Sequence, residues 1–470
     1  MRRARSCRDI CGGWGMSDTT QSQFSRYQLA ELAAPGSDTF VDGPFGSSLK
    51  SHEYVDSGVR LIQLQNIGEG EWRDENKKFI TFRKFKTLER HGAVPGDIAI
   101  AKMADPVARA CIVPAVSKQF VVVADCIRLR LDDSRFNAGY VVRAINSPYT
   151  RREAENKAIG STRVRINLSV LKTVGCLAPA LPEQKKIAQI LDTLDTTIRE
   201  TEAIIAKLKA VKQGLLHDLL TRGLDDNGEL RPPQSEAPHL YKKSPLGWVP
   251  KEWGSRKIED CLIQIVDGDR GKNYPSESEF TSDGYCLFLN AKNVTRDGFK
   301  FEETLFITEP KDRALGSGKL VRNDIVITTR GTIGNFGFFD DSITFEHMRV
   351  NSGMLILRNQ DASINSAFLF LSLKNYIFHF ELQTKGSGSA QPQLPSKDLK
   401  TFHILLPPIV EQIVIAEKII KFEQRVASEE KALSKAIKLK SGLMDDLLTG
   451  RVRVTPLLNH LRDTPPEAAP

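Results

Sequence analysis

The sequence has few of the features that would insert a protein into a membrane, cross-link it or load it with zinc. No apolar run approaches the ~18 residues of a membrane span, and no apolar h-region follows the N-terminal arginines, so we expect neither membrane association nor secretion. The seven cysteines are odd in number, and none belongs to a C-x-x-C pair typical of zinc sites. They are Cys7, Cys11, Cys111, Cys126, Cys176, Cys261 and Cys286. We interpret them as reduced thiols of a cytoplasmic protein.

Signatures of catalysis are missing as well. The eight histidines show no H-x₃-H or similar spacing, and no adenine methyltransferase motif such as N-P-P-Y or D-P-P-F occurs. The sequence GSGK at 316–319 resembles a phosphate-binding loop, but Arg313 replaces its first glycine and Leu320 its Ser or Thr. Glu75 and Glu155 each begin an E-x-K tripeptide of the kind seen in metal nucleases, without a clear partner carboxylate. We therefore expect no catalytic residue, metal or cofactor in this chain.

What the chain does have is length, apolar content and positive charge. Its 470 residues suggest about three domains, and a 40% apolar content is sufficient for buried cores. The formal net charge is +8. This balance favours a polyanionic partner such as nucleic acid.

The most informative feature is a stretch that occurs twice. Residues 183–221 return as residues 411–449 without a gap, at a constant offset of 228 (411 − 183 and 449 − 221). Apolar residues recur at alternating steps of four and three in both copies, which predicts long helices over 181–222 and 407–450. Each would be about 60 Å long, with a narrow apolar seam that it cannot bury alone, so we predict that the two seams pack together as a coiled coil. The seam residues are Ile187, Leu191, Leu194, Ile198, Ile205 and Leu208 in the first copy and Ile415, Ile419, Phe422, Val426 and Leu433 in the second.

The rest of the sequence predicts two mixed α/β globules, at 24–180 and 251–406. Short β-type runs alternate with turns in both, and residues 140–154 have the pattern of a helix. The order is globule, helix, globule, helix. The expected fold class is therefore α+β, with two mixed domains separated by long helices and an internal two-fold repeat.

The connecting and terminal segments have a different composition. Residues 223–250 are rich in proline and are expected to form a semi-extended linker. Residues 1–23 are expected to be disordered, and 451–470 to form a frayed tail. Met16 begins a run that looks like an ordinary N-terminus, so the first fifteen residues are expected to be an upstream extension.

Several short motifs, taken in order, resemble the specificity (S) subunits of type I restriction-modification systems. They are DGPFGSSLK at 42–50, GDI at 96–98, LPEQ at 181–184, LPPIVEQ at 406–412 and LLTGRV at 447–452. The likeness covers about residues 24–455, and the order and duplication of the motifs make it specific. The second helix begins with LPPIVEQ where the first has LPEQ, so its entry turn is expected to differ.

This resemblance implies that each globule is a target recognition domain for one half of a bipartite double-stranded DNA site. It implies that the two helices form an antiparallel coiled coil, which sets the distance between the half-sites and docks two methyltransferase (M) subunits. Restriction (R) subunits complete the complex. S-adenosylmethionine, ATP and Mg²⁺ are then expected on those partners, and this chain would be a non-catalytic recognition subunit.

Contacts to DNA phosphates need cations and backbone N–H groups in exposed loops, whereas base recognition needs Arg, Asn or Gln. In the first globule the candidates are Arg83, Lys84, Lys86, Lys102, Arg109, Ser161, Thr162, Arg163 and Arg165. In the second they are Arg270, Lys272, Asn273, Arg330, Thr332, Lys385, Ser387, Ser389 and Gln391. We favour the Gly-Ser loops that begin at Gly160 and Gly386, because both precede a long helix at equivalent places. For any single candidate, a solvated surface charge is the simpler interpretation.

Two other functions stay open at this point. One is a coiled-coil interaction scaffold that binds no particular DNA sequence, which predicts no DNA preference when a partner is present. The other is a self-contained metal-dependent nuclease built on Glu75 and Glu155, which predicts metal-dependent cutting by the purified chain.

Overall fold

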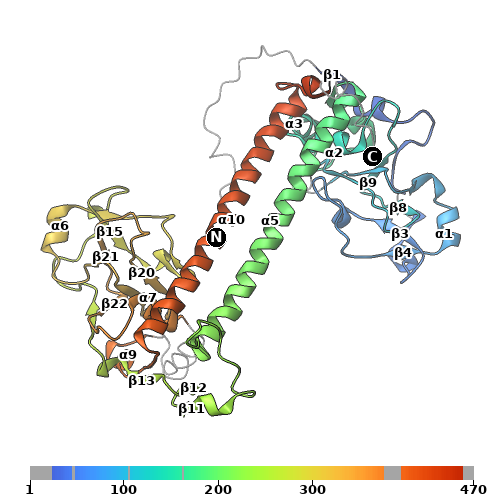
Figure 1. Cartoon of the computed structure of the whole chain (residues 1–470). Coiled ribbons are helices and arrows are strands. Elements are labelled where there is room, and N and C mark those ends of the chain that lie inside the picture. The colour runs from blue at the N-terminus through green and yellow to red at the C-terminus, as the bar shows by residue number, and fades with distance from the viewer. Residues whose placement is uncertain (1–23, 45–47, 104–105, 161–163, 375–392, 459–470) are drawn as a thin grey trace. The chain divides into compact units, whose positions relative to one another are not determined.

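The computed structural model describes residues 24–44, 48–103, 106–160, 164–374 and 393–458. Contacts within the chain divide it into two compact units. Unit 1 comprises Met1–Glu202 and Ala432–Pro470, and unit 2 comprises Ala203–Lys431. Each unit holds one mixed α/β domain and a part of each long helix (Figure 1).

The domain of unit 1 is built on two four-stranded sheets. Its strands are β1 (Ser25–Gln28), β2 (Phe40–Asp42), β3 (Val59–Ile62), β4 (Phe79–Ile80), β5 (Gly92–Ala93), β6 (Ile98–Ala101), β7 (Ala110–Ile112), β8 (Phe120–Val122), β9 (Cys126–Leu129) and β10 (Gly175–Ala178). The sheets have the orders β2-β9-β6-β7 and β4-β3-β8-β5, and β1 pairs with β10. Only β3 and β8 run parallel among these pairs. Both are buried along their whole length, as parallel strands usually are.

Short helices and turns complete this domain. They are η2 (Leu29–Leu32), η4 (Ser51–Glu53), η5 (Leu64–Asn66), α1 (Phe82–Lys86), η6 (Glu89–His91), α2 (Ala138–Asn146), α3 (Pro148–Lys157) and α4 (Leu168–Leu171). The single helix expected over 140–154 is therefore two helices. Ser147 has an extended backbone between them, and Pro148 has no N–H with which to continue α2.

Unit 2 repeats most of this topology, although its sheet β18-β15-β21 has three strands where β4-β3-β8-β5 has four. Its strands are β11 (Tyr241–Ser244), β12 (Gly247–Pro250), β13 (Gly254–Lys257), β14 (Ile263–Asp267), β15 (Cys286–Leu289), β16 (Val294–Thr295), β17 (Gly298–Phe299), β18 (Phe306–Ile307), β19 (Ile325–Thr328), β20 (Phe336–Phe338), β21 (Met348–Val350), β22 (Met354–Asn359) and β23 (His403–Leu406). Its helices and turns are η7 (Pro238–Leu240), η8 (Ile258–Asp260), η9 (Glu277–Glu279), η10 (Ala291–Asn293), α6 (Glu309–Ala314), α7 (Ser366–Leu373) and α9 (Ser396–Lys400). The sheet β14-β22-β19-β20 matches β2-β9-β6-β7, and β15 runs parallel to β21 as β3 does to β8. The internal two-fold repeat is thus confirmed.

The two long helices are α5 (Leu181–Thr221) and α10 (Ile409–Thr449), of 41 residues each. Unit 1 contains the start of α5 beside the end of α10 (Figure 1). Lys440 Nζ lies 2.5 Å from Asp195 Oδ1 there, and apolar residues of both helices share one buried core. The two helix segments therefore pack antiparallel in unit 1.

Unit 2 contains the end of α5 beside the start of α10, again antiparallel. Lys212 Nζ lies 2.9 Å from Glu423 Oε1 across this pair. Every predicted seam residue is buried or half-buried, whereas Ile204 and Val211, which lie beside the seam, are each 46% exposed. The antiparallel coiled coil is confirmed, and the burial of these residues is what a seam at the predicted positions requires.

A buried glutamine ties each long helix to the domain before it. Gln184 Oε1 accepts the Asn137 N–H at 2.9 Å, and Gln184 Nε2 donates to the carbonyls of Arg135 at 3.1 Å and Pro179 at 2.8 Å. The counterparts 228 residues later make the same three bonds: Gln412 with Asn365, Ser363 and Pro407, at 2.9, 3.0 and 2.8 Å. Neither glutamine has exposed surface. These amides fix the direction in which each helix leaves its domain.

The segment 223–250 is not the semi-extended linker that its prolines suggested. It contains the β11–β12 hairpin, and Leu224 and Val249 are buried in one core with the end of α5. Arg231 also pairs with Glu411 in the first turn of α10, at 2.6 Å. The apolar residues between the prolines have a surface to pack on, which the composition alone did not show.

The segment after α10 is also folded over part of its length. Arg453 pairs with Glu183 at 2.7 Å, and Val454 is 3% exposed. The frayed tail that we expected from residue 451 therefore does not begin there. Residues 459–470 and the expected extension at 1–23 lie outside the described residues.

Replacing Gln184 by alanine is expected to lower the free energy of unfolding of unit 1 by about 1–3 kcal/mol, because three buried or partly buried backbone groups lose their partner. Thermal unfolding of the full chain, followed by circular dichroism, measures this loss. Gln189→Ala, on the exposed side of the same helix, is the matched control and should cost less than about 0.5 kcal/mol. Equal unfolding temperatures for both variants would contradict the role of Gln184.

Candidate nucleic-acid interface

The carboxyl ends of the parallel strands β3 and β8 lie at one end of the unit 1 domain. Strand β3 runs into η5, and β8 runs into the turn 123–125. Gly43, directly after β2, passes so close to this turn that a Cβ atom there would overlap the Val123 carbonyl oxygen. The glycine of the DGP motif thus allows two backbones to meet. Several loops converge at this end as a result.

Two ion pairs lie among these loops. Lys102 Nζ is 3.0 Å from Asp42 Oδ2, and the Lys102 side chain is only 3% exposed. Arg165 Nη2 is 2.7 Å from Asp125 Oδ1, and the Arg165 side chain is 42% exposed. Of the predicted contacts in this region, Arg165 therefore combines a fixed position with access to solvent.

Lys102 and Arg109 are buried, which contradicts their predicted role as DNA contacts. Arg109 is 9% exposed and donates from Nε to the Ile67 carbonyl at 2.7 Å and from Nη2 to the Leu64 carbonyl at 2.9 Å. Burial of this guanidinium lowers the pKa of Arg109. Both cations brace the loops from inside and cannot reach a phosphate.

Helix α1 carries the other predicted cations of unit 1. Arg83 and Lys86 are exposed, whereas Lys84 is partly buried and pairs with Glu53 of η4 at 2.7 Å. That ion pair is the largest cause of a lowered pKa of Glu53. Phe82 at the start of α1 is 64% exposed. This helix presents an aromatic ring and cations together.

Unit 2 places two exposed arginines beside the turn that follows β21. Arg270 Nη2 donates to the Ser352 carbonyl at 3.3 Å, and a Cβ atom built on Gly353 would lie 3.7 Å from Arg330 Cβ. Gly268 repeats the close approach of Gly43, because a Cβ atom there would overlap the carbonyl oxygen of Asn351. The structure therefore brings Arg270 and Arg330 together at the corresponding end of this domain.

A carboxylate fixes the loop that carries Arg270, Lys272 and Asn273. Asp269 accepts the Gly271 N–H at 2.7 Å, and these backbone hydrogen bonds lower the pKa of Asp269. It also accepts the N–H groups of Gly316 and Ser317, so the GSGK segment binds a side chain of its own domain. Lys272 and Asn273 are exposed, and Asn273 Nδ2 donates to the Ala314 carbonyl at 2.9 Å.

Thr332, in the loop between β19 and β20, is exposed, and its carbonyl accepts the Thr328 hydroxyl.

The first Gly-Ser loop is described only at its ends, and the second lies outside the described residues. Outside the described residues lie the predicted contacts Ser161, Thr162, Arg163, Lys385, Ser387, Ser389 and Gln391. Arg165 forms isolated β-bridges with Met103 and Ile159, and Gln393 forms one with Arg330. Arg165 and Gln393, the described residues that follow the two loops, therefore lie beside the convergent loops.

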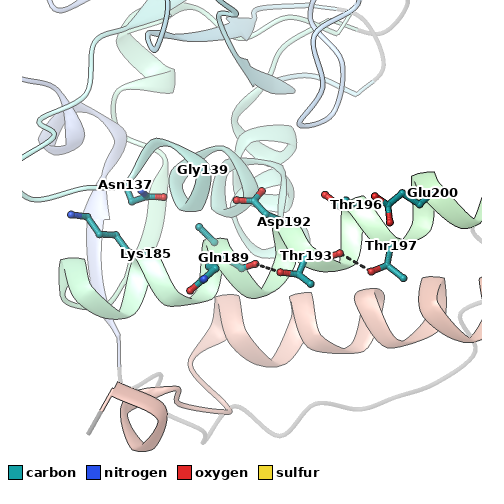
Figure 2. Close-up of a pocket in the computed structure, with 10 residues that line it drawn as sticks. Asn137, Gly139, Lys185, Gln189, Asp192, Thr193, Thr196, Thr197 and Glu200 are labelled. Carbon is teal, nitrogen blue, oxygen red and sulfur yellow. Dashed lines mark hydrogen bonds between the residues drawn. The ribbon is translucent and has the colours of Figure 1, made fainter. Parts of the chain in front are cut away.

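A groove of about 620 Å³ lies between the start of α2 and the outer face of α5 in unit 1. Figure 2 shows Lys185, Asp192 and Glu200 along it, together with threonines of α5. The Thr193 and Thr197 hydroxyls donate to the carbonyls four residues earlier, at 2.9 Å each, so they are not activated nucleophiles.

Within the described ranges, no group of three or more His, Cys, Asp or Glu side chains is arranged to hold a metal ion. Glu75 and Glu155, on which the nuclease alternative depended, are both exposed. Among the described helices, none is both long and apolar enough to cross a membrane.

Sequence reasoning missed two buried asparagines, Asn66 and Asn293, which hold η5 and η10 from inside. The signal was present as a weak internal repeat, because QNI at 65–67 and KNV at 292–294 are 227 residues apart (292 − 65). Without the sheet topology, that short match could not be separated from chance.

The five cysteines in the described part of the chain are all free and buried. Burial raises the pKa of Cys111, Cys176 and Cys286 to about 12. It also raises the pKa of Cys126 and Cys261. These groups remain protonated thiols near neutral pH, and only a thiolate is an effective nucleophile.

A Cys7→Ser/Cys11→Ser variant keeps only the five buried thiols. At pH 8 we expect its native form to react with an aromatic disulfide reagent on the order of 100-fold more slowly than the form unfolded in urea, because burial suppresses both ionisation and access. Absorbance of the released thiolate follows the reaction. Rapid labelling of even one equivalent in native buffer would contradict the burial described above.

Comparisons with known proteins agree with this architecture. A family model described as "Type I restriction modification DNA specificity domain" matches residues 75–210 and 250–439. The specificity subunit of the type I restriction enzyme MjaVIII from Methanocaldococcus jannaschii is 25% identical over 344 residues, which cover 72% of this chain and 76% of that protein. The EcoBI specificity subunit from Escherichia coli is 23% identical over 423 residues, covering 87% and 82%.

Solved structures show the same fold. The crystal structure of the S subunit of a type I restriction-modification system from M. genitalium superposes with a TM-score of 0.54 at 14% identity, covering 93% of this chain and 98% of that one. A chain from a structural study of complex assembly and conformational transition in the type I system gives a TM-score of 0.52 at 15% identity, covering 91% and 98%.

Proposed function

The chain belongs to the family of type I restriction-modification DNA specificity proteins, and we propose that each of its two domains reads one half of a bipartite double-stranded DNA site. It is the recognition subunit of such a system and not an enzyme. One observation best supports two DNA-recognition domains: loops converge at the corresponding end of both. They meet around the turn 123–125 in unit 1 and around Ser352 in unit 2.

The exposed cations at these ends are the proposed phosphate contacts. Arg165 in unit 1 pairs with Asp125, and Arg270 in unit 2 donates to the Ser352 carbonyl. These two arginines and Arg330 are open to solvent. Phosphate contacts orient a protein on the duplex, and residues at the base edges then select the sequence. The cations of α1 and the residues of the Gly-Ser loops are proposed to extend this surface.

The long helices are proposed to set the spacing of the half-sites and to dock partners. Exposed apolar side chains outside the seam support docking: Ile204 and Val211 on α5, and Val410, 70% exposed, on α10. We propose two methyltransferase subunits and restriction subunits as these partners. S-adenosylmethionine, ATP and Mg²⁺ would bind to those subunits, in the cytoplasm.

The alternative of a scaffold without DNA preference makes a different prediction from a reading subunit. A scaffold gives binding that does not depend on DNA sequence. A recognition subunit in the assembled complex gives preference for one bipartite sequence and strong salt dependence.

For the assembled complex and its target, the logarithm of the binding constant is expected to fall linearly with the logarithm of the salt concentration. The slope should be about −0.9 for each phosphate contacted. The double variant Arg270→Gln/Arg330→Gln should reduce this slope by about 0.9 for each phosphate that is no longer neutralised. Fluorescence anisotropy between about 50 and 200 mM salt measures it. Lys421→Gln, a 77% exposed position on α10, is the matched control and should leave the slope unchanged. An unchanged slope in the double variant would show that neither arginine contacts a phosphate.

Inserting one heptad into each helix, after Glu202 and after Lys431, should lengthen the spacer of the recognised sequence. Seven residues add about 10.5 Å while keeping the seam in register, which corresponds to about three base pairs. Mapping of methylated adenines on a random-sequence library reads both half-sites and the spacer. A seven-residue insertion between Asn227 and Gly228, in a turn, is the control and should leave the spacer unchanged. A constant spacer in the helix variant would contradict the proposal that the long helices set the distance between the half-sites.

A further inference from the structure

The turn that follows the first parallel strand is built in the same way in both domains. In unit 1, the buried Asn66 holds η5 from inside: its Nδ2 donates to the carbonyls of Arg73 at 3.0 Å and Glu75 at 2.8 Å, and its Oδ1 accepts the Gln63 N–H at 3.0 Å. In unit 2, Asn293 holds η10 through the carbonyls of Lys300 and Glu303 and the Asn290 N–H, at 3.1, 2.8 and 3.0 Å. All the polar atoms of these two amide groups are used internally.

A second brace reaches each turn from the neighbouring hairpin. Arg109, just before β7, donates to the Leu64 and Ile67 carbonyls. Asn335, just before β20, donates from Nδ2 to the Val294 carbonyl at 2.9 Å. The backbone of each turn is therefore fixed from two sides.

The residue at the tip of each turn differs between the domains. Gln65 in unit 1 is exposed, and its side chain makes no hydrogen bond to another described residue. Lys292, its counterpart in unit 2, is 72% exposed and pairs with Glu303, itself 71% exposed, at 2.6 Å. Such a surface ion pair contributes little to stability. Neither tip is needed to hold its turn, so each is free to bind something else.

Both tips lie at the ends where the cations gather. Gln65 lines a cavity of about 240 Å³ together with Pro44, Tyr54 and Asp125, and Asp125 is the partner of Arg165. In unit 2, Asn335 ties η10 to the hairpin that carries Arg330. A fixed polar tip next to proposed phosphate contacts has the geometry that base recognition requires.

We propose that Gln65 and Lys292 are base-reading residues of the first and second half-sites. This inference rests on the proposed function and adds residue-level chemistry to it. The planar amide of Gln65 matches the N6 donor and N7 acceptor of adenine, and the ammonium of Lys292 matches the O6 and N7 acceptors of guanine. One braced turn thus serves both domains, and the side chain at its tip selects the base.

The test exchanges the two tips in the complex assembled with its methyltransferase subunits. Gln65→Lys is expected to change one position of the first half-site from adenine to guanine, and Lys292→Gln to make the reverse change in the second. Each variant should leave the other half-site and the spacer unaltered. Mapping of methylated adenines on a random-sequence library reads all three properties.

Matched controls carry the same chemical changes elsewhere. Gln119→Lys lies before β8, at the end of that strand opposite the turn 123–125, and Lys242→Gln lies on β11; both positions are exposed. Both controls should retain the wild-type target. Gln65→Ala should relax the same position as Gln65→Lys, with discrimination between bases reduced by about 5- to 100-fold.

Unchanged half-sites in both exchange variants, at normal methylation rates, would overturn the inference. If the Gln65→Lys complex is inactive, selection of bound sequences with the Gln65→Ala complex decides instead: preference relaxed at one position supports the assignment, and unaltered preference overturns it. Failure of the proposed function has a different signature, because the wild-type complex itself would then show no sequence preference.

Discussion

A helix of 41 residues with a narrow apolar seam cannot bury that seam by itself, and this constraint organises the chain. Each seam is covered by the other helix, antiparallel in both units. The first turn of each helix also contacts the segment that follows the other helix. Glu183 of α5 binds Arg453, and Glu411 of α10 binds Arg231. These two ion pairs make each unit depend on residues far apart in the sequence.

The two domains share their buried polar contacts and differ at their exposed tips. The hydrogen bonds of Gln184 recur at Gln412, and those of Asn66 recur at Asn293. A buried amide cannot be replaced without leaving its partners unsatisfied, whereas an exposed side chain such as Gln65 can change at little cost in stability. This difference allows one scaffold to present different side chains to the two halves of a target.

Sequence reasoning was most successful where a long pattern repeats. The helices and their seam were predictable because tens of residues contribute to one periodicity. It failed where a single side chain had to be judged. Lys102 and Arg109 are cations that the sequence suggests are exposed in loops. Both are buried, because Asp42 and backbone carbonyls of distant segments bind them. The prediction of a semi-extended linker at 223–250 was wrong for a similar reason, because Leu224 and Val249 pack against apolar residues at the end of α5.

The sequence by itself determined the two long helices, the partners of their seams and the two-fold order of globule and helix, because these follow from local periodicity and from the cost of exposing apolar surface. Only the tertiary structure decided which cations reach solvent and which turns are rigid. Those properties depend on hydrogen bonds such as those from Arg109 and Asn335, whose donors and acceptors are about 40 residues apart and meet only when the sheets have formed.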